Sequence, residues 1–264
     1  MITFQKYVRA QSLEEAYQLN QARNNRIVGG MLWLKTGSGN YNTIIDLSDL
    51  GLNTIDETDT EFSIGAMVSL RQIEQHAGLN TYSQNAICDA VKDIVGVQFR
   101  NMATVGGSIW GRFGFSDVLS VFLCMDSYVE LFNAGLVPLE DFSKQKYDND
   151  ILVRLIVKKT PGSFAYSAMR AQRTDFPVLT CAVSRINEAY RVSIGARPSK
   201  AILIKDFQNN LNIKEINEET AQKMADYVAD NVPTASNLRG SSEYRTHLAR
   251  GLTYRNLMKL GGTF

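Results

Sequence analysis

RNMATVGGSIWGRFGFSD, from Arg100 to Asp117, is the most informative stretch of this 264-residue chain. It contains a Thr-Val-Gly-Gly-Ser turn, Thr104 to Ser108, and then an aspartate nine residues further on. A Gly pair lets backbone N–H groups approach a bulky anion with no Cβ atom in the way. Successive N–H groups in such a turn form a concave anion site. The stretch therefore predicts a backbone cradle for a phosphate group.

A second Gly pair, Gly29 and Gly30, follows the short apolar run Ile27-Val28. Taken alone, this pair is more often a plain turn after a strand. Together, the two Gly-Gly loops indicate two backbone cradles that close on one diphosphate, and so a bound dinucleotide. The segment at residues 37–42, GSGNYN, lacks the last glycine of G-x-G-x-x-G, so the usual dinucleotide fingerprint is absent.

These residues carry a family resemblance. The chain resembles the FAD-binding medium subunits of the molybdenum hydroxylases, the xanthine dehydrogenase and carbon monoxide dehydrogenase family. Such subunits read Ala-Gly-Gly-Thr-Asp/Ser near the start and Arg-Asn-x-Ala-Thr-Ile-Gly-Gly-Asn in the middle. The counterparts here are Val28–Leu32 and Arg100–Ser108, and Ser116-Asp117 matches the family's Ser/Ala-Asp pair. Residues 194–198 (IGARP) and 241–257 (SSEYRTHLARGLTYRNL) resemble its C-terminal domain, so the similarity covers essentially the whole chain.

The resemblance implies that this chain binds FAD. At the first loop Met31 stands in place of Thr, and Leu32 in place of Asp or Ser. One or two side-chain hydrogen bonds are then lost, each worth ~1 kcal/mol net, while the backbone donors remain. The cofactor-binding residues that the resemblance implies are Val28, Gly29, Gly30, Met31, Leu32, Trp33, Ala103, Thr104, Gly106, Gly107, Ser108, Arg112, Asp117 and Tyr166.

Three of these positions leave alternatives open. The planar fork of Arg112 suits a phosphate, although a solvated side chain or an inter-subunit salt bridge fits equally well. Asp117 is a helix N-cap, a cofactor ligand, or both. Tyr166 stands where an aromatic residue of the family lies against the flavin ring; taken alone, it is a core or surface tyrosine. A lysine usual two positions later is replaced by Ala168, and Arg170 is a candidate substitute.

The resemblance also implies a role in a larger oxidoreductase. A large subunit with the molybdenum cofactor would hydroxylate the substrate, and a small subunit with [2Fe–2S] clusters would relay electrons to FAD on this chain. NAD is the expected acceptor, and xanthine, another purine and nicotinate are all compatible substrates. The flavin carries the chemistry, so we predict no catalytic side chain. A stand-alone flavin oxidoreductase and an FAD-less assembly subunit are the alternatives.

Composition excludes several other classes. With 28 Lys and Arg against 27 Asp and Glu, the chain shows no basic footprint for nucleic acid. No apolar run approaches the ~20 residues of a membrane span, and the N-terminus does not read as a signal peptide. Cys88, Cys124 and Cys181 read as buried thiols of a reducing cytoplasm. They are too few for an iron–sulfur cluster, and with only two histidines a metal site is not expected.

The mixed order of strands and helices favours the α+β class. The resemblance implies a two-lobed FAD-binding region of the vanillyl-alcohol-oxidase-like type over residues 1–160, with lobes at about 1–55 and 56–160. A small antiparallel α+β domain then covers residues 163–264, after the KKTPG boundary at residues 158–162.

Local signals predict individual elements. Capping boxes at Ser12–Glu15 and Ser69–Gln72 open two helices, the second of which we expect to end at Gly78. Asp117 is expected to cap another helix, and Asn187-Glu188 to turn a hairpin. Further helices are expected at 86–95, 218–229 and 242–260, and strands at 26–28, 43–47, 62–66, 128–132, 151–157, 178–185 and 190–196.

Overall fold

The computed structural model describes residues 1–211, 213 and 215–262. The chain forms two compact units, each built from separate stretches of sequence. Unit 1 comprises Met1–Ile73, Gly96–Gly111 and Ser127–Val157, and unit 2 comprises Glu74–Val95, Arg112–Asp126 and Lys158–Phe264. The domain division at about residue 160 stays a prediction.

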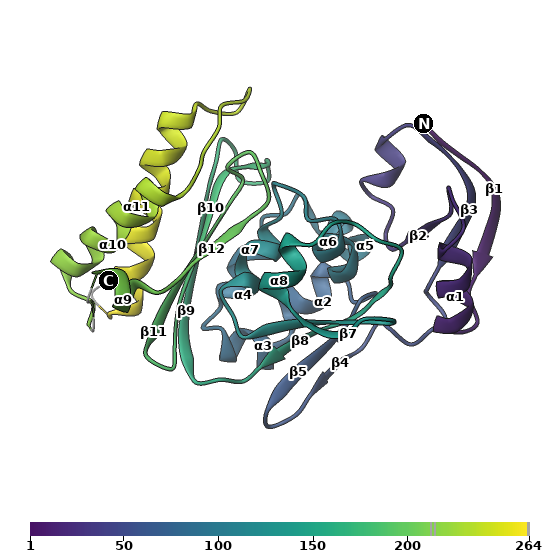
Figure 1. Ribbon diagram of the computed structural model, residues 1–264, viewed down its shortest axis with the longest axis horizontal. Helices are drawn as coiled ribbons and strands as arrows, with labels where there is room; N and C mark the ends of the chain where they lie inside the picture. Colours follow the sequence, from purple (N-terminus) through teal and green to yellow (C-terminus); the bar gives the residue numbers. More distant parts are fainter. Residues whose placement is uncertain (212, 214, 263–264) are drawn as a thin grey trace. The chain divides into compact units, whose positions relative to one another are not determined.

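Unit 1 begins with a parallel three-stranded sheet in the order β1-β3-β2. Its strands are β1 (Ile2–Arg9), β3 (Gly39–Asp46) and β2 (Arg26–Val28), and α1 (Leu13–Asn20) connects β1 to β2 (Figure 1). Ser12 caps α1 by accepting the N–H of Glu15 at 3.1 Å, as the capping box predicts. The apolar side of this part is a cluster of Ala10, Ala16, Ile45, Leu47, Leu52, Ile151 and Val153.

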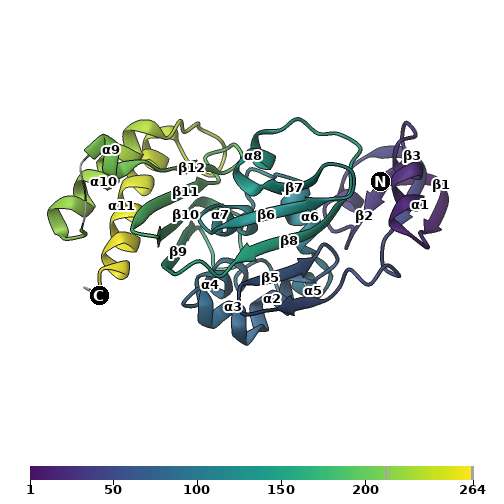
Figure 2. The same ribbon diagram turned by 60° about the horizontal axis from the view of Figure 1, so that its bottom comes forward.

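The second sheet of unit 1 has five strands in the order β4-β5-β8-β6-β7 (Figure 2). These are β4 (Ile55–Glu57), β5 (Glu61–Gly65), β8 (Leu152–Lys158), β6 (Ser127–Leu131) and β7 (Gly135–Pro138). Helix η1 (Leu34–Thr36) contacts β1 of the first sheet, and the remaining helices are α2 (Leu70–Gln75), α5 (Val97–Met102), α6 (Val105–Trp110) and α8 (Leu139–Lys144).

Unit 2 is built on an antiparallel sheet in the order β12-β11-β10-β9. Helices α10 and α11 lie against one face of this sheet, and α4 and α7 against the other (Figure 1). The strands are β9 (Gly162–Arg170), β10 (Pro177–Ile186), β11 (Ala189–Gly195) and β12 (Ile202–Ile204). The helices are α3 (Ala77–Tyr82), α4 (Ala86–Val91), α7 (Asp117–Leu123), α9 (Phe207–Leu211), α10 (Glu218–Asn231) and α11 (Ser242–Leu260).

Strand β10 is buried along most of its length because both faces are covered. Cys181 and Val183 belong to the apolar cluster that includes residues of α10 and α11. On the other face, Thr180 Oγ1 lies 2.9 Å from Ser120 Oγ, and Ser184 donates to the carbonyl of Cys124 at 2.5 Å. The period-two alternation of a strand thus separates an apolar face from a hydroxyl-bearing one.

Most local predictions agree with the structure, but two predicted helix ends do not. Asn187 and Glu188 have φ angles of 47° and 64°, as a tight hairpin turn requires. The helix that follows Ser69 ends at Gln75, and His76 Nδ1 accepts the N–H of Leu79 to start α3. Gly78 therefore lies inside a helix, and the prediction that it ends one is wrong. Helix α4 also stops at Val91, earlier than expected.

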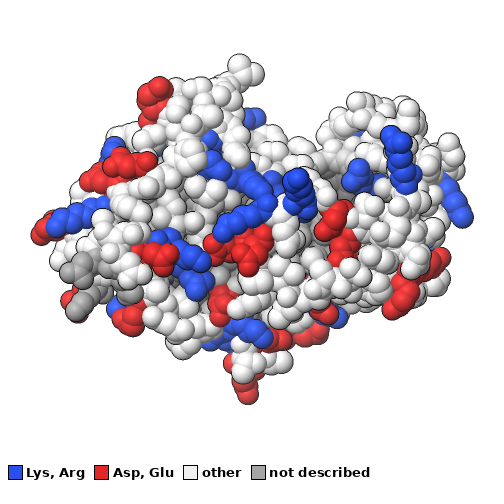
Figure 3. Space-filling model, in the orientation of Figure 1, with Lys and Arg blue, Asp and Glu red and all other residues white. Residues whose placement is uncertain are grey.

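Acidic and basic side chains are interspersed over the face drawn in Figure 3, in line with the near-neutral composition. Within the described part of the chain, no helix is both long and apolar enough to cross a membrane.

Candidate functional site

The first Gly pair follows the end of β2 and packs closely against residues 102–104, which precede α6. A Cβ atom on Gly30 would lie 1.8 Å from the carbonyl oxygen of Met102. A Cβ atom on Gly29 would lie 2.5 Å from Thr104 Oγ1. Because 1.8 Å is far inside van der Waals distance, only glycine fits at position 30. The two glycine motifs of the sequence therefore meet within unit 1.

The backbone of the first loop offers open hydrogen-bond donors. Among the described residues, no hydrogen bond uses the backbone N–H of Gly29, Gly30, Met31 or Leu32. Met31 has a φ of 57°, a left-handed conformation that is uncommon for a residue with a long side chain. Successive open N–H groups around such a residue form a concave site for an anion. The first loop therefore fits a phosphate oxygen.

The second Gly pair lies in the first turn of α6, which differs from the open turn that the sequence predicts. Thr104 caps this helix, and its Oγ1 accepts the N–H of Gly107 at 3.1 Å. The N–H of Gly106 donates to the carbonyl of Ala66 at 2.8 Å, and a Cβ on Gly106 would lie 2.7 Å from the same oxygen. Both N–H groups are thus used inside the protein. These glycines let α6 approach the neighbouring backbone closely.

Unit 1 contains a pocket of about 430 Å³ beside these segments. This volume lies within the roughly 300–1,000 Å³ of small-molecule sites. Much of the pocket wall comes from two segments that the glycine motifs did not indicate, residues 20–27 and 148–152. Tyr41 and Trp110 also line the pocket. The predicted cofactor residues that line it are Val28, Gly29, Thr104, Gly106 and Gly107.

Six predicted residues of unit 1 lie outside the pocket wall: Gly30, Met31, Leu32, Trp33, Ala103 and Ser108. Trp33 packs edge-on against Phe99 with 5.7 Å between ring centroids, and Ser108 Oγ donates to the carbonyl of Thr104 at 2.9 Å. The structure thus gives these two side chains roles in holding the loops. Cofactor contacts for all six stay predictions.

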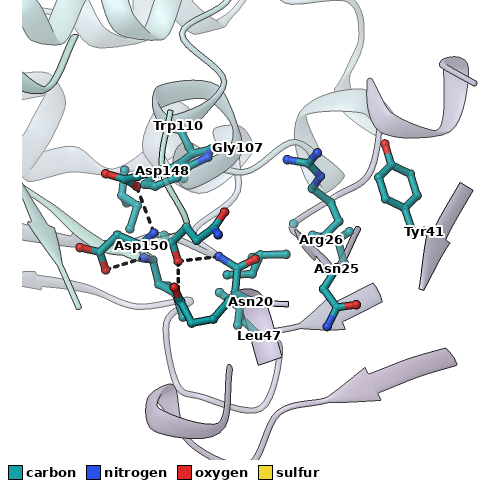
Figure 4. A pocket seen from close by; sticks show the side chains of 18 of the residues that line it. Asn20, Asn25, Arg26, Tyr41, Leu47, Gly107, Trp110, Asp148 and Asp150 are labelled. Atoms are coloured by element: carbon teal, nitrogen blue, oxygen red, sulfur yellow. Dashed lines mark hydrogen bonds between the residues drawn. The ribbon is translucent and has the colours of Figure 1, made fainter. Parts of the chain in front are cut away.

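Polar groups tie together the two segments that the motifs missed. The carbonyl of Asn149 accepts the side-chain amides of Asn20 at 2.8 Å and Gln21 at 3.0 Å. The Asp150 carboxylate accepts backbone N–H groups at 2.7–2.9 Å, and Asp148 accepts the N–H of Asp150 at 3.0 Å. Figure 4 shows Asp148 and Asp150 on one side of the pocket and Arg26 and Tyr41 on the other.

Unit 2 holds the other predicted site residues. Ser116 Oγ accepts the N–H of Leu119 at 3.1 Å, so Ser116 is the N-cap of α7 and Asp117 is the first residue of that helix. The prediction that Asp117 caps this helix is wrong, because the serine hydroxyl one residue earlier already reaches the free N–H group. Arg112 is buried with a φ of 40°, and its pairing with a phosphate stays a prediction.

Asp117 is the centre of a buried polar cluster in unit 2. Its Oδ1 accepts the Tyr166 hydroxyl at 2.5 Å and lies 2.5 Å from Arg170 Nη2. Burial raises the pKa of Asp117 to about 6, although Arg170 and Tyr166 both oppose that rise. Arg170 also donates to the carbonyl of Asp175 at 2.6 Å. Tyr166 is only 5% exposed, and its contact with a flavin ring stays a prediction.

Comparison with known proteins identifies the family. Residues 2–159 match the family described as the FAD binding domain in molybdopterin dehydrogenase. The chain belongs to this family of FAD-binding subunits. Residues 164–260 match the CO dehydrogenase flavoprotein C-terminal domain, so the two matches together span nearly the whole chain. The resemblance to the FAD-binding medium subunits of the molybdenum hydroxylases is thereby confirmed, and with it an oxidoreductase subunit whose cofactor is FAD.

Individual relatives agree with this family of FAD-binding subunits. The glyceraldehyde dehydrogenase medium chain of Sulfolobus acidocaldarius is 26% identical over 271 residues, covering 94% of this chain and 95% of the relative. The xanthine dehydrogenase FAD-binding subunit of Escherichia coli O157:H7 is 25% identical over 278 residues, covering 96% of this chain and 94% of the relative. A chain of reconstituted CO dehydrogenase from Oligotropha carboxidovorans superposes on this chain with a TM-score of 0.87 at 20% identity. The match covers 99% of this chain and 98% of that one. This structural likeness confirms the predicted α+β fold.

The described residues contain no group of three or more His, Cys, Asp or Glu side chains arranged to hold a metal ion. The three cysteines are free thiols; Cys124 and Cys181 are buried, and Cys88 is half-buried. His76 serves as a helix cap through Nδ1. Nothing in these arrangements adds a second candidate site to the pocket of unit 1.

Proposed function

We propose that this chain binds FAD at the pocket of unit 1, with the diphosphate on the open N–H groups of Gly29 to Leu32. The observation that carries the proposal is this row of open donors beside a pocket of about 430 Å³. Backbone donors do not depend on the side chains of the loop. The replacements at Met31 and Leu32 therefore weaken the cradle by ~1 kcal/mol for each lost hydrogen bond and leave it in place.

Gly107 is the most useful position for testing this proposal. It lines the pocket, and a Cβ there would meet only Thr104 Oγ1, at 3.1 Å. Gly107→Asp places a carboxylate at the wall of a diphosphate site, whereas Gly107→Asn adds a neutral side chain of the same shape. We expect FAD affinity to fall at least tenfold further in the Asp variant, by charge repulsion. Equal FAD affinities in the two variants would contradict the placement.

The proposed role is that of the electron-transfer subunit of a molybdenum-containing hydroxylase. When bound, a flavin exchanges single electrons with a metal cluster and a hydride with a nicotinamide. We infer that the partners are a large subunit with the molybdenum cofactor and a small [2Fe–2S] subunit that supplies electrons, and that NAD accepts them. The relatives named as a dehydrogenase medium chain and a FAD-binding subunit support this inference.

The acceptor is tested separately from the cofactor. The FAD-loaded chain is titrated with NADH without oxygen, and the flavin absorbance is followed. Bleaching by NADH supports NAD as the physiological partner. Retention of the oxidised spectrum, in a sample that dithionite does reduce, would rule out NAD as the acceptor and leave FAD binding untouched.

A further inference from the structure

Arg26 is a pocket residue that lies close in sequence to the first glycine loop. It is the first residue of β2, three positions before Gly29, and it lines the pocket. Its guanidinium carbon lies 5.6 Å from the centre of the Tyr41 ring, on the neighbouring strand β3. This separation is within the range of a cation–π contact, which holds a long side chain in place without neutralising its charge.

The charge of Arg26 has no acidic partner. Among the residues that the structure describes, the Arg26 guanidinium makes no hydrogen bond and no ion pair. Arg9 in the same sheet is different, because its Nη2 lies 2.5 Å from Asp49 Oδ1. Arg23 also lines the pocket and likewise has no acidic partner in the described structure. Two arginines that line the pocket therefore carry positive charge that no acidic side chain among the described residues neutralises.

The two acidic side chains that line the pocket accept hydrogen bonds from backbone N–H groups and do not pair with Arg26. Asp150 and Asp148 lie across the pocket from Arg26 (Figure 4). The Asp150 carboxylate is held by backbone N–H groups at 2.7–2.9 Å, and Asp148 caps the same loop at 3.0 Å. These bonds hold Asp150 against Asn133 and Ala134 of the turn after β6, and Asp148 within its own loop. Arg26, on the opposite side of the pocket, thus remains available to bind an anion.

We propose that Arg26, held over Tyr41, is a side-chain ligand for the phosphate of the bound dinucleotide. The inference rests on the proposed function, because it assumes that a dinucleotide enters this pocket. A guanidinium presents paired N–H donors that match phosphate oxygens. Arg26 would then replace the side-chain hydrogen bonds that Met31 and Leu32 have lost at the first loop. Arg26 and Gly29 lie three positions apart and both line the pocket, so this charge and the first of the open backbone donors face the same cavity.

Equilibrium binding of FAD to the cofactor-free chain tests the proposal, with NaCl concentration as a second variable. In Arg26→Ala we expect the Kd for FAD to rise about 10- to 100-fold, as for a lost charge-assisted hydrogen bond. The dependence of Kd on salt should also become flatter, since one screened charge contact is gone. Arg26→Lys should keep the salt dependence and recover part of the affinity. Arg9→Ala is the matched control and should change neither quantity.

The outcomes separate this inference from the proposed function. If Arg26→Ala binds FAD like the wild type, Arg26 is not a ligand. If the variant loses affinity with an unchanged salt dependence, Arg26 acts only on the fold, and the inference is equally wrong. In either case FAD binding by the wild type would leave the proposed function standing. A wild type that binds no FAD at any salt concentration would overturn both.

Discussion

The carboxylate oxygen Oδ1 of Asp117 lies 2.5 Å from Nη2 of Arg170, and the two side chains are only 4% and 8% exposed. Burial of an ion pair removes both charges from water, and their attraction repays that cost only in part. Here the desolvation of the carboxylate outweighs the help from Arg170 and Tyr166, so the pKa of Asp117 rises to about 6. This pair therefore makes the stability of unit 2 depend on pH.

Because the pKa of Asp117 is raised in the folded chain, the free energy of unfolding falls as the pH rises. The pKa of Asp117 rises from an ordinary value of 3.8 to about 6, so the folded chain holds this proton more tightly than the unfolded chain does. The stabilisation is complete below pH 3.8 and is lost as the pH rises through 6. We expect it to be worth about 3 kcal/mol at most. Urea unfolding from pH 4 to 8 should show this fall in the wild type and a flatter profile in Asp117→Asn, and parallel profiles would contradict the assignment.

Arg170→Met is predicted to destabilise the chain more at pH 8 than at pH 4. At pH 4 the Asp117 carboxyl is neutral in both proteins, and the variant loses only the hydrogen bonds of Arg170 to Asp117 and to the carbonyl of Asp175. At pH 8 the variant leaves a buried carboxylate without its counter-charge, at a cost of about 3–5 kcal/mol. Unfolding free energies at the two pH values measure the difference. An equal loss at both would mean that Arg170 does not compensate this charge.

Gly30→Ala is predicted to destabilise unit 1 and to weaken FAD binding. The new Cβ would lie 1.8 Å from the Met102 carbonyl oxygen, so the loop must move. Overpacking of this kind costs about 1–3 kcal/mol or more. Gly37→Ala is the matched control, because a Cβ there lies 3.4 Å from the Leu34 carbonyl oxygen. Thermal unfolding of the two variants should separate them, and similar midpoints would refute the close approach.

Glu188→Gly is predicted to stabilise unit 2. Glu188 has a φ of 64°, which disfavours any residue with a Cβ atom, and Asn187-Gly is the preferred pair for such a hairpin turn. We expect a gain of about 0.5–1 kcal/mol, since the exposed ion pair with Arg185 contributes little. Glu188→Ala loses the same ion pair and keeps the strained angle, so it should bring no gain. Urea midpoints decide between these outcomes.

The sequence predicted those parts of the fold that depend on neighbours in the chain. The capping box at Ser12, the hairpin at Asn187-Glu188 and the last two helices each rest on residues a few positions apart. The family resemblance supplied the rest of the architecture. The end of α2 was predicted wrongly because the sequence favoured a helix end at Gly78. Instead, His76, which is an uncommon N-cap residue, starts a new helix two residues earlier.

The candidate site was only partly predictable, because its walls come together from distant segments. The glycines marked the first loop and α6, but nothing local to Gly30 shows that it touches Met102. Arg26 was not singled out from the sequence, although it is the first residue of the strand that leads to the glycines. Its contact with Tyr41 depends on the pairing of β2 with β3, which is not visible in the sequence.

Whether this chain binds FAD is decided by adding FAD to the purified, cofactor-free chain. Flavin absorbance and fluorescence are followed as FAD is added, and the stoichiometry is read from the end point. We expect saturable binding of one FAD per chain, with weaker binding in Gly107→Asp than in Gly107→Asn. A folded chain that stays colourless with excess FAD would contradict the account and would point to an assembly subunit that has lost its cofactor.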